Sequence, residues 1–138
     1  ISQIAGQQKE KFEGSTICSK RVVAICMLIK RELINKIGGF DPVFGVGSFE
    51  DDDYCLRSIL SGFQNVIAQE VFIYHFGSMT FKQQKNLRHD AMRTNWLKFK
   101  KKWGLPENMP FPAKDYLDQL DYAKMNQSKD NIYIPLYQ

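Results

Sequence analysis

The sequence predicts an α/β fold in which a short mixed sheet is packed by helices, with one long helix toward the C-terminus. Three patterns indicate this fold. Residues 22–29 form a continuous apolar run rich in Val and Ile, which is typical of a strand buried on both faces. Apolar residues recur at three- and four-residue spacing from Cys55 to Phe63, as on one face of a helix. A further helical pattern covers residues 83–102.

Size and composition favour one folded domain, or part of one. The chain has 138 residues, of which 43% are apolar and 25% charged, so a single core can form without disulfides. The longest apolar run has eight residues, whereas a membrane-spanning helix needs about 20. Three cysteines, Cys18, Cys26 and Cys55, lack the spacing of ligand pairs, and we expect buried thiols in a reducing compartment.

The first third of the chain is expected to change from loop to strand to helix. Residues 1–17 are polar and weakly periodic, so we predict a loop there, within an N-terminal connection over residues 1–20. The chain lacks an initiator Met and a secretory leader, and it resembles a segment cut from a longer protein. A strand is predicted over residues 21–30 and a short helix over residues 31–37, ended by Gly38 and Gly39.

An acidic helix is predicted over residues 49–61, after a Gly-rich loop. Ser48 is expected to cap its N-terminus, with Asp51 as the partner three residues on. Negative charge in the first turn suits the helix dipole. Gly62 is expected to end the helix.

The sequence of the second half of the chain predicts fewer helices and strands. Residues 66–74 have the β-branched and aromatic content of one or two short strands, and they end at His75. The long helix of residues 83–102 is followed by Trp103, Gly104 and Pro106. Beyond it, in a C-terminal extension of residues 105–138, we expect a short helix near residues 116–120 and a final tail or docking strand.

Four consecutive carboxylates at the start of the acidic helix permit two interpretations. Helical spacing places Asp51 and Asp52 over the apolar face, while Glu50 and Asp53 lean away and Asp53 can pair with Arg57. In one interpretation Asp51 only caps the helix, and the other acids are solvated surface residues that the helix dipole favours. In the other, a carboxylate enters a cleft as a base or metal ligand, beside the mobile loop of residues 44–48 and the strand-terminal His75.

The chain has a net charge of +4, and its positive charge is concentrated in one segment. Residues 82–102 carry +7, and the remainder carries −3. Such a segment suits nucleic acid, anionic lipid, phosphate ligands or simple solvation, and composition alone does not choose. A nucleic-acid interface is disfavoured, because Trp96, Phe99 and Trp103 are spaced for core packing rather than for exposed stacking. His89 lies in this segment and is expected at the surface.

Five short motifs occur together in the order and at the spacing of one known family. They are residues 26–32 (CMLIKRE), 37–42 (IGGFDP), 50–57 (EDDDYCLR) with 62–63 (GF), 74–81 (YHFGSMTF), and 95–99 (NWLKF) with 102–104 (KWG). Residues 21–104 therefore resemble the C-terminal, acceptor-side half of a family 2 glycosyltransferase. The resemblance implies part of a Rossmann-like GT-A fold.

This resemblance also implies a function and the residues that carry it. The longer enzyme would transfer a sugar from a nucleotide-diphosphate donor to a carbohydrate, lipid or protein acceptor, with inversion. Asp51 would be the catalytic base with Glu50 beside it, and His75 would help to hold a divalent cation, Mn or Mg. The acceptor side would be formed by Phe44, Gly45, Gly47, Ser48 and Asp52. No nucleic-acid partner is implied, and a membrane surface is only a weak alternative partner.

One part of the family pattern is absent from the sequence. The donor-binding half, with its own Asp-x-Asp metal motif, does not occur in these 138 residues. We therefore expect no tightly bound ion and no activity from the fragment alone, and a cytoplasmic location, at most peripheral to the inner face of the membrane. The alternative function is a non-catalytic binding module that uses the acidic cluster and the Gly-rich loop.

Overall fold

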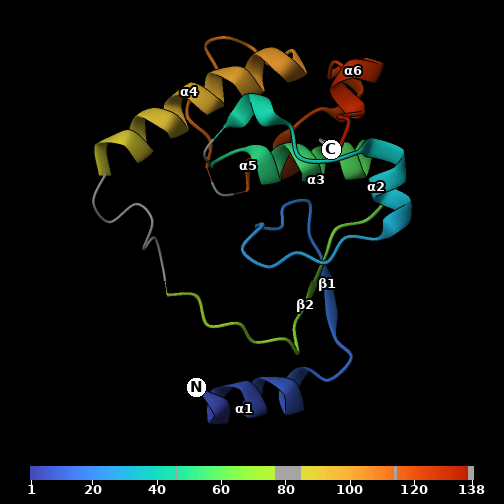
Figure 1. Ribbon diagram of the computed structural model, residues 1–138, viewed down its shortest axis with the longest axis vertical. Helices are drawn as coiled ribbons and strands as arrows, with labels where there is room; N and C mark the ends of the chain where they lie inside the picture. The colour runs from blue at the N-terminus through green and yellow to red at the C-terminus, as the bar shows by residue number, and fades with distance from the viewer. Residues whose placement is uncertain (46, 77–84, 114, 137–138) are drawn as a thin grey trace.

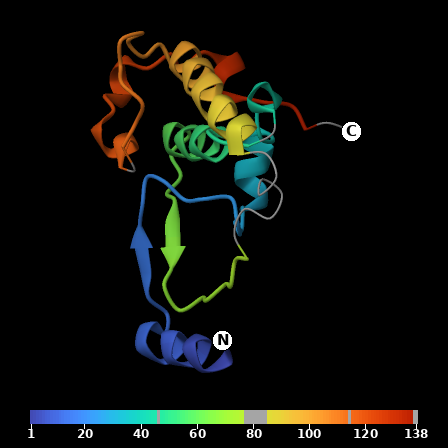
Figure 2. The ribbon, with the colours of Figure 1, turned by 90° about the vertical axis from the view of Figure 1, so that its left-hand side faces the viewer.

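The computed structural model has a mixed α/β architecture, with about 47% helix and one small sheet. It describes residues 1–45, 47–76, 85–113 and 115–136, with the backbone alone for residues 85–89. Most helices gather at one end of the molecule, and the sheet connects them to the N-terminal helix at the other end (Figures 1 and 2). The α/β class is confirmed, while the GT-A assignment stays a prediction.

The N-terminal segment differs from the predicted loop. Helix α1 (Ser2–Phe12) leads into strand β1 (Thr16–Cys18), which pairs antiparallel with strand β2 (Val66–Ala68). Helix α1 buries none of its residues, so it has no apolar stripe that periodicity could detect. Strand β2 confirms one of the strands predicted over residues 66–74. The expected mixed sheet is instead antiparallel and two-stranded in the described part of the chain.

Residues 21–30 do not form the predicted buried strand. The segment is irregular, with Val23 and Ile25 exposed and Leu28 fully exposed. An apolar run becomes a strand only if neighbouring strands accept its backbone hydrogen bonds, and none of the described segments pairs with it. The Val22 amide instead donates to the Cys55 sulfur at 3.3 Å.

The central helices follow their sequence signals. Helix α2 (Arg31–Ile37) and helix α3 (Glu50–Leu60), separated by the short helix η1 (Pro42–Phe44), lie where they were predicted. Gly62 has a φ of 85° just beyond α3, as its predicted stop requires. Gly38 is required by close packing as well as by its φ of 75°, because an added Cβ would lie 1.6 Å from the carbonyl oxygen of Ile134.

The C-terminal extension is packed against the rest of the molecule. After helix α4 (Lys85–Trp103) come α5 (Tyr116–Gln119), η3 (Tyr122–Lys124) and α6 (Lys129–Ile132). Near the C-terminus, Ile134 makes a parallel bridge with Gly38: its amide donates to the Ile37 carbonyl at 3.0 Å, and its carbonyl accepts from Gly39 at 2.9 Å. The expected docking of the tail is thereby observed.

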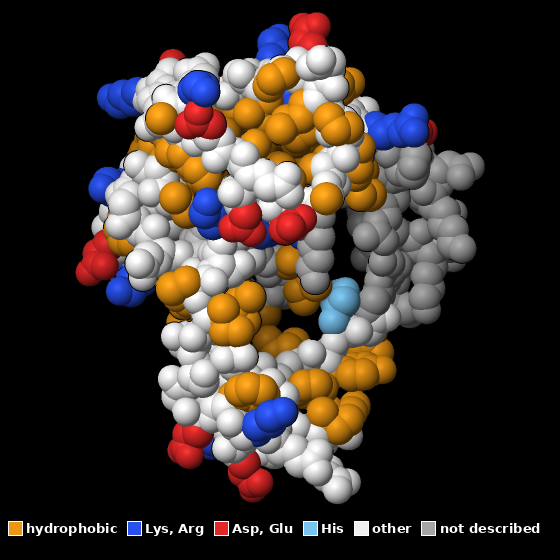
Figure 3. All heavy atoms as spheres, turned by 180° about the vertical axis from the view of Figure 1, so that it is seen from behind, with side chains coloured by type: hydrophobic (Ala, Val, Ile, Leu, Met, Phe, Trp, Pro, Cys, Tyr) orange, Lys and Arg blue, Asp and Glu red, His pale blue; other side chains and the backbone are white. Residues whose placement is uncertain are grey.

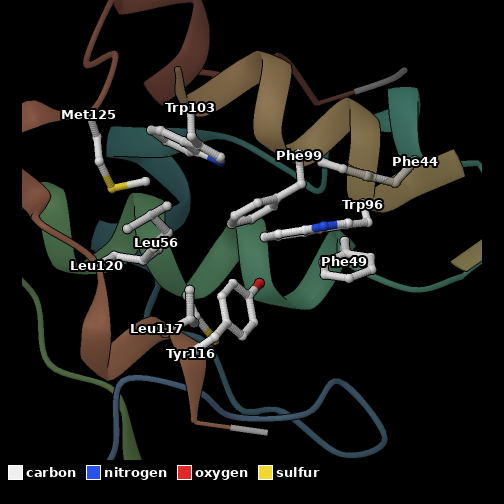
Figure 4. Packing of buried hydrophobic residues seen from close by; sticks show 11 residues of the cluster. Phe44, Phe49, Leu56, Trp96, Phe99, Trp103, Tyr116, Leu117, Leu120 and Met125 are labelled. Carbon is white, nitrogen blue, oxygen red and sulfur yellow. The ribbon is translucent and has the colours of Figure 1, made fainter. Parts of the chain in front are cut away.

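The core lies between α3, α4 and the C-terminal extension, and aromatic rings dominate it (Figure 4). Trp96 and Trp103 of α4 are both buried, as expected for a long helix that packs against the core. The main cluster contains Phe44, Phe49, Cys55, Leu56, Trp96, Phe99, Trp103, Tyr116, Leu117, Leu120 and Met125.

The cysteines only partly match their prediction. Cys55 is buried, but Cys18 and Cys26 are exposed, because neither strand β1 nor the irregular segment after it is covered. Burial raises the pKa of the Cys55 thiol to about 11. Among the helices of the described residues, none has the length and apolar character to cross a membrane.

A buried charge network joins α3 to α4. Asp53 is fully buried, and its carboxylate accepts from Arg57 Nε at 2.8 Å and from Trp103 Nε1 at 3.0 Å. Lys102 Nζ lies 2.7 Å from Asp53 and 2.7 Å from Asp41. The predicted pair of Asp53 and Arg57 is confirmed, but Asp53 points inward rather than away from the core.

Arg57 connects the same network to α2. The guanidinium donates to the carbonyls of Ile37 at 2.9 Å and Gly39 at 2.8 Å, and it lies over the Tyr54 ring at 4.8 Å from the ring centroid. Every arm of this buried cation therefore has a partner, which a buried charge requires.

Replacing Asp53 with alanine is expected to destabilise the fold by about 3–5 kcal/mol, because Arg57 would remain buried without its anion and Lys102 would keep only Asp41. Urea unfolding measures the change. Asp121→Ala is the matched control, since its pair with Lys124 is exposed and should contribute little. Equal losses in the two variants would show that the buried network does not stabilise the fold.

Candidate functional site

The first turn of α3 divides its four carboxylates into two groups. Asp52 forms a salt bridge with Arg21, and Asp53 belongs to the buried network. Glu50 and Asp51 form no salt bridge within the described residues. The two acids that the family resemblance assigns to catalysis are thus the two without a salt bridge in the part of the chain that the structure describes.

Asp51 is held just below the surface. Its side chain is on the buried face of α3, as predicted, and the residue is 7% exposed. One oxygen accepts from the Ala24 amide at 3.3 Å, and the other accepts from the Asp52 amide at 2.9 Å. The irregular segment that contains Ala24 therefore covers this carboxylate, and an acceptor hydroxyl would reach it only after that segment moves.

Asp52 is engaged by Arg21 rather than open to an acceptor. It is 2% exposed, and the guanidinium donates to both of its oxygens. Burial raises the pKa of Asp52 above its ordinary value, although the hydrogen bond from Arg21 opposes the shift. The predicted acceptor contact of Asp52 would require this ion pair to open.

Glu50 is the least satisfied of the four acids. Its Oε2 atom is buried and has no hydrogen-bond partner in the part of the chain that the structure describes. Burial raises the pKa of Glu50, and the charge of Asp51 raises it further. An oxygen in this state is available to a ligand or a proton.

The loop before α3 is held from α4. Asn95 is 2% exposed, and its Nδ2 donates to the carbonyls of Phe44, Gly47 and Ser48 at 2.6, 2.9 and 3.1 Å. Phe44 is buried in the core, so its ring does not line an acceptor surface, whereas Gly45 is exposed and Gly47 and Ser48 are half-buried.

Ser48 does not cap α3 as predicted. The residue before the helix is Phe49, which forms no side-chain cap, and Ser48 and Phe49 both have left-handed backbones with φ of 76° and 75°. This strained path carries the Phe49 ring into the core, where its centroid lies 5.4 Å from that of Trp96. Aromatic burial has overridden the local capping signal.

His75 follows β2 in an extended segment and is exposed. No hydrogen bond or ion pair links it to Asp51 among the described residues, and no group of three His, Cys, Asp or Glu side chains in that part could hold a metal ion. The described residues therefore do not make a metal centre by themselves. Gly77 and Ser78, which the sequence analysis grouped with His75, lie outside the described residues.

Much of the basic segment serves the fold. Lys98 Nζ donates to the Val43 carbonyl at 2.7 Å, Lys100 Nζ to the Met109 carbonyl at 3.2 Å, and Lys102 pairs with Asp41 and Asp53. Simple solvation is therefore not the role of these three lysines, whereas Arg93 and Lys101 are exposed. Arg88 is a further basic residue of this segment, and its side chain lies outside the described residues.

Sequence reasoning missed Arg21, and it gave Asn95 and Tyr116 no role at the site. Arg21 precedes Asp52 by 31 residues, so no local periodicity connects the two. Asn95 was noted only as part of a motif. Tyr116 was expected on a short helix, but nothing in its spacing indicates that its ring packs beside Phe49, with centroids 6.4 Å apart.

Glu50→Gln is expected to stabilise the chain at neutral pH. A carboxyl whose pKa is raised by folding stabilises the protein below its ordinary value of 4.5, and that contribution is lost as the pH rises through the folded-state pKa. The gain over the wild type should therefore be present at pH 7 and vanish near pH 4. Urea unfolding across this range measures it, with Glu13→Gln as an exposed control; a gain independent of pH would contradict the assignment.

Comparison with known proteins finds one partial relative. An uncharacterized protein, y4gI, of Sinorhizobium fredii (strain NBRC 101917 / NGR234) is 35% identical over 57 residues, which are 41% of this chain and 6% of that protein. The chain thus spans only a small part of the relative's length. No family model matches the chain, and no solved structure matches it.

Proposed function

We propose that this chain is the acceptor-side part of a family 2 glycosyltransferase, which transfers a sugar from a nucleotide-diphosphate donor to an acceptor with inversion. The proposal rests on the five sequence motifs and on one structural observation that supports them. At the start of α3, Asp52 and Asp53 are paired with cations, while Glu50 and Asp51 have no cation partner among the described residues. The separation of roles matches the assignment of Asp51 as base and Glu50 as its neighbour.

In this mechanism Asp51 removes the proton from the acceptor hydroxyl while that oxygen attacks the anomeric carbon. The hydroxyl becomes more acidic as the new bond forms, so a carboxylate of ordinary basicity is sufficient. The Ala24 amide now occupies one oxygen of Asp51, and the acceptor would replace it. Inversion would follow because the acceptor oxygen, activated by the base, would attack the anomeric carbon from the face opposite the leaving diphosphate.

The proposed cation would need more ligands than the described residues supply. His75 is proposed as one ligand of a Mn or Mg ion, which would neutralise charge on the diphosphate when bound. Because the described residues do not complete such a site, no step is assigned to the ion here. The remaining ligands would come from a donor-binding half in the longer enzyme.

A non-catalytic binding module is the second candidate. It is favoured by the covered position of Asp51, which a binding module tolerates better than a transferase. In that case Glu50 and the loop held by Asn95 would recognise a cation or a basic partner. Sugar transfer by the longer protein discriminates between the two functions.

Asp51→Asn in the longer enzyme is expected to reduce sugar transfer about 10²- to 10⁴-fold, because the amide cannot accept the proton. Release of nucleoside diphosphate from the donor sugar, with acceptor present, measures the rate. Asp41→Asn is the control, since it loses a carboxylate that pairs with Lys102 outside the candidate site. Turnover that is unchanged by Asp51→Asn would remove this residue from the role of base.

His75→Ala is expected to raise the concentration of Mn or Mg needed for half-maximal transfer, because one ligand would be lost. A metal titration of the longer enzyme measures the shift. The exposed aromatic neighbour gives a control in Tyr74→Ala, which removes a side chain of the same segment without a metal ligand. Identical titrations for the wild type and His75→Ala would refute the ligand assignment.

A further inference from the structure

The irregular segment between β1 and α2, residues 20–30, crosses the face of α3 that carries Asp51 and Cys55. In Figures 1 and 2 this segment passes below α3. The Ala24 amide donates to Asp51 at 3.3 Å. Val22 contacts the Cys55 sulfur through both its amide and its carbonyl, each at 3.3 Å. Asp51 and Cys55 are one helical turn apart, so one cover lies over both, and we name residues 20–30 the strap.

The strap is attached at both ends and weakly bound between them. Its ends continue into β1 and α2. Residues 20–29 form no backbone–backbone hydrogen bond with any part of the chain that the structure describes. Leu28 is fully exposed, while Val22 and Met27 are half-buried and pack against the main cluster. A segment with so few backbone bonds and buried apolar contacts opens at a lower free energy than the whole fold.

Arg21 makes the strongest attachment of the strap to α3. Its guanidinium reaches both oxygens of Asp52, whereas the other contacts to α3 are made by backbone groups of the strap. Hydrogen bonds between charged groups are stronger than those between neutral groups. The Ser19 hydroxyl donates to the Arg21 carbonyl at 2.6 Å and accepts from its amide at 3.3 Å, which fixes the backbone of Arg21.

The same pair decides how favourable the closed strap is. Asp52 is almost fully buried, and a buried carboxylate is stable only beside a cation or strong donors. Without Arg21, the closed strap would keep Asp52 from water and give it no cation. Opening would return the carboxylate to water and would also release the Ala24 amide from Asp51.

We propose that the strap is an autoinhibitory element that opens as one unit, and that the pair of Arg21 with Asp52 is the latch that keeps it closed. Inhibition rests on the proposed function, because it concerns the access of an acceptor to Asp51, whereas local opening does not. A ligand of Asp51 binds only the open chain, so its apparent affinity is reduced by the fraction of chain that is open.

Alkylation of Cys55 by iodoacetamide in the 138-residue chain measures the opening, because the strap backbone contacts the sulfur. Cys18 and Cys26 are exposed and are replaced by serine in every variant. Cys55 is expected to react through an opening whose free energy lies below that of global unfolding. This free energy should hardly change in low urea, since little surface becomes exposed. Alkylation with the free energy and urea dependence of global unfolding would overturn the proposal.

Arg21→Met tests the latch. It is expected to raise the alkylation rate of Cys55 about 5- to 30-fold, as for the loss of one such pair, because Asp52 would remain covered without its cation. Iodoacetamide is neutral, so the lost charge does not itself attract the reagent. Arg31→Met is the matched control, since Arg31 follows the strap, is exposed and forms no salt bridge among the described residues. Equal rates in the two variants would show that Arg21 is not the latch.

Arg21→Met in the longer enzyme separates inhibition from opening. Its KM for the acceptor is expected to fall as alkylation becomes faster, because a larger fraction of the enzyme is open. Faster alkylation with an unchanged KM would overturn the autoinhibitory role. Faster alkylation in a longer protein that transfers no sugar would reject the transferase and retain the latched strap.

Discussion

The burial of Asp53 is the constraint on which the rest of this structure depends. A fully buried carboxylate needs cations, and it obtains them from Arg57 on its own helix and from Lys102 on α4. Arg57 then binds the carbonyls that end α2, and Lys102 also binds Asp41. The buried charge of Asp53 thereby links α3 to α2 and α4 and fixes the position of the first turn of α3 against them.

That arrangement explains why adjacent acids in one sequence motif have different roles. Successive residues of a helix point about 100° apart, so Asp53 enters the core while Asp52 meets Arg21. Asp51 turns toward the segment that contains Ala24, and one oxygen of Glu50 finds no hydrogen-bond partner among the described residues. The same geometry pairs two carboxylates with cations that stabilise the fold and gives the other two no salt bridge among the described residues.

The largest departures from prediction involve apolar residues that lack partners. Val23 and Ile25 lie in the segment predicted as a strand, and Val71 and Ile73 follow β2; all four are exposed. Figure 3 shows apolar side chains at the surface in the lower part of the molecule as well as in its upper part. A two-stranded sheet is marginal by itself. A strand-like pattern shows that a segment is able to pair with another strand. Pairing also needs a neighbouring strand, and none of the described segments lies beside these residues in that way.

Local signals in the sequence were sufficient for α2, α3 and α4, because apolar periodicity, charge placement and terminal glycines act within a few residues. The pair of Asp53 and Arg57 followed from the same spacing. The hydrogen bonds from Asn95 to the loop before α3 and the approach of the Tyr116 hydroxyl to Asp52 came only from tertiary structure. Each depends on atoms far apart in the sequence, and packing of rings around Phe49 decided where those atoms meet.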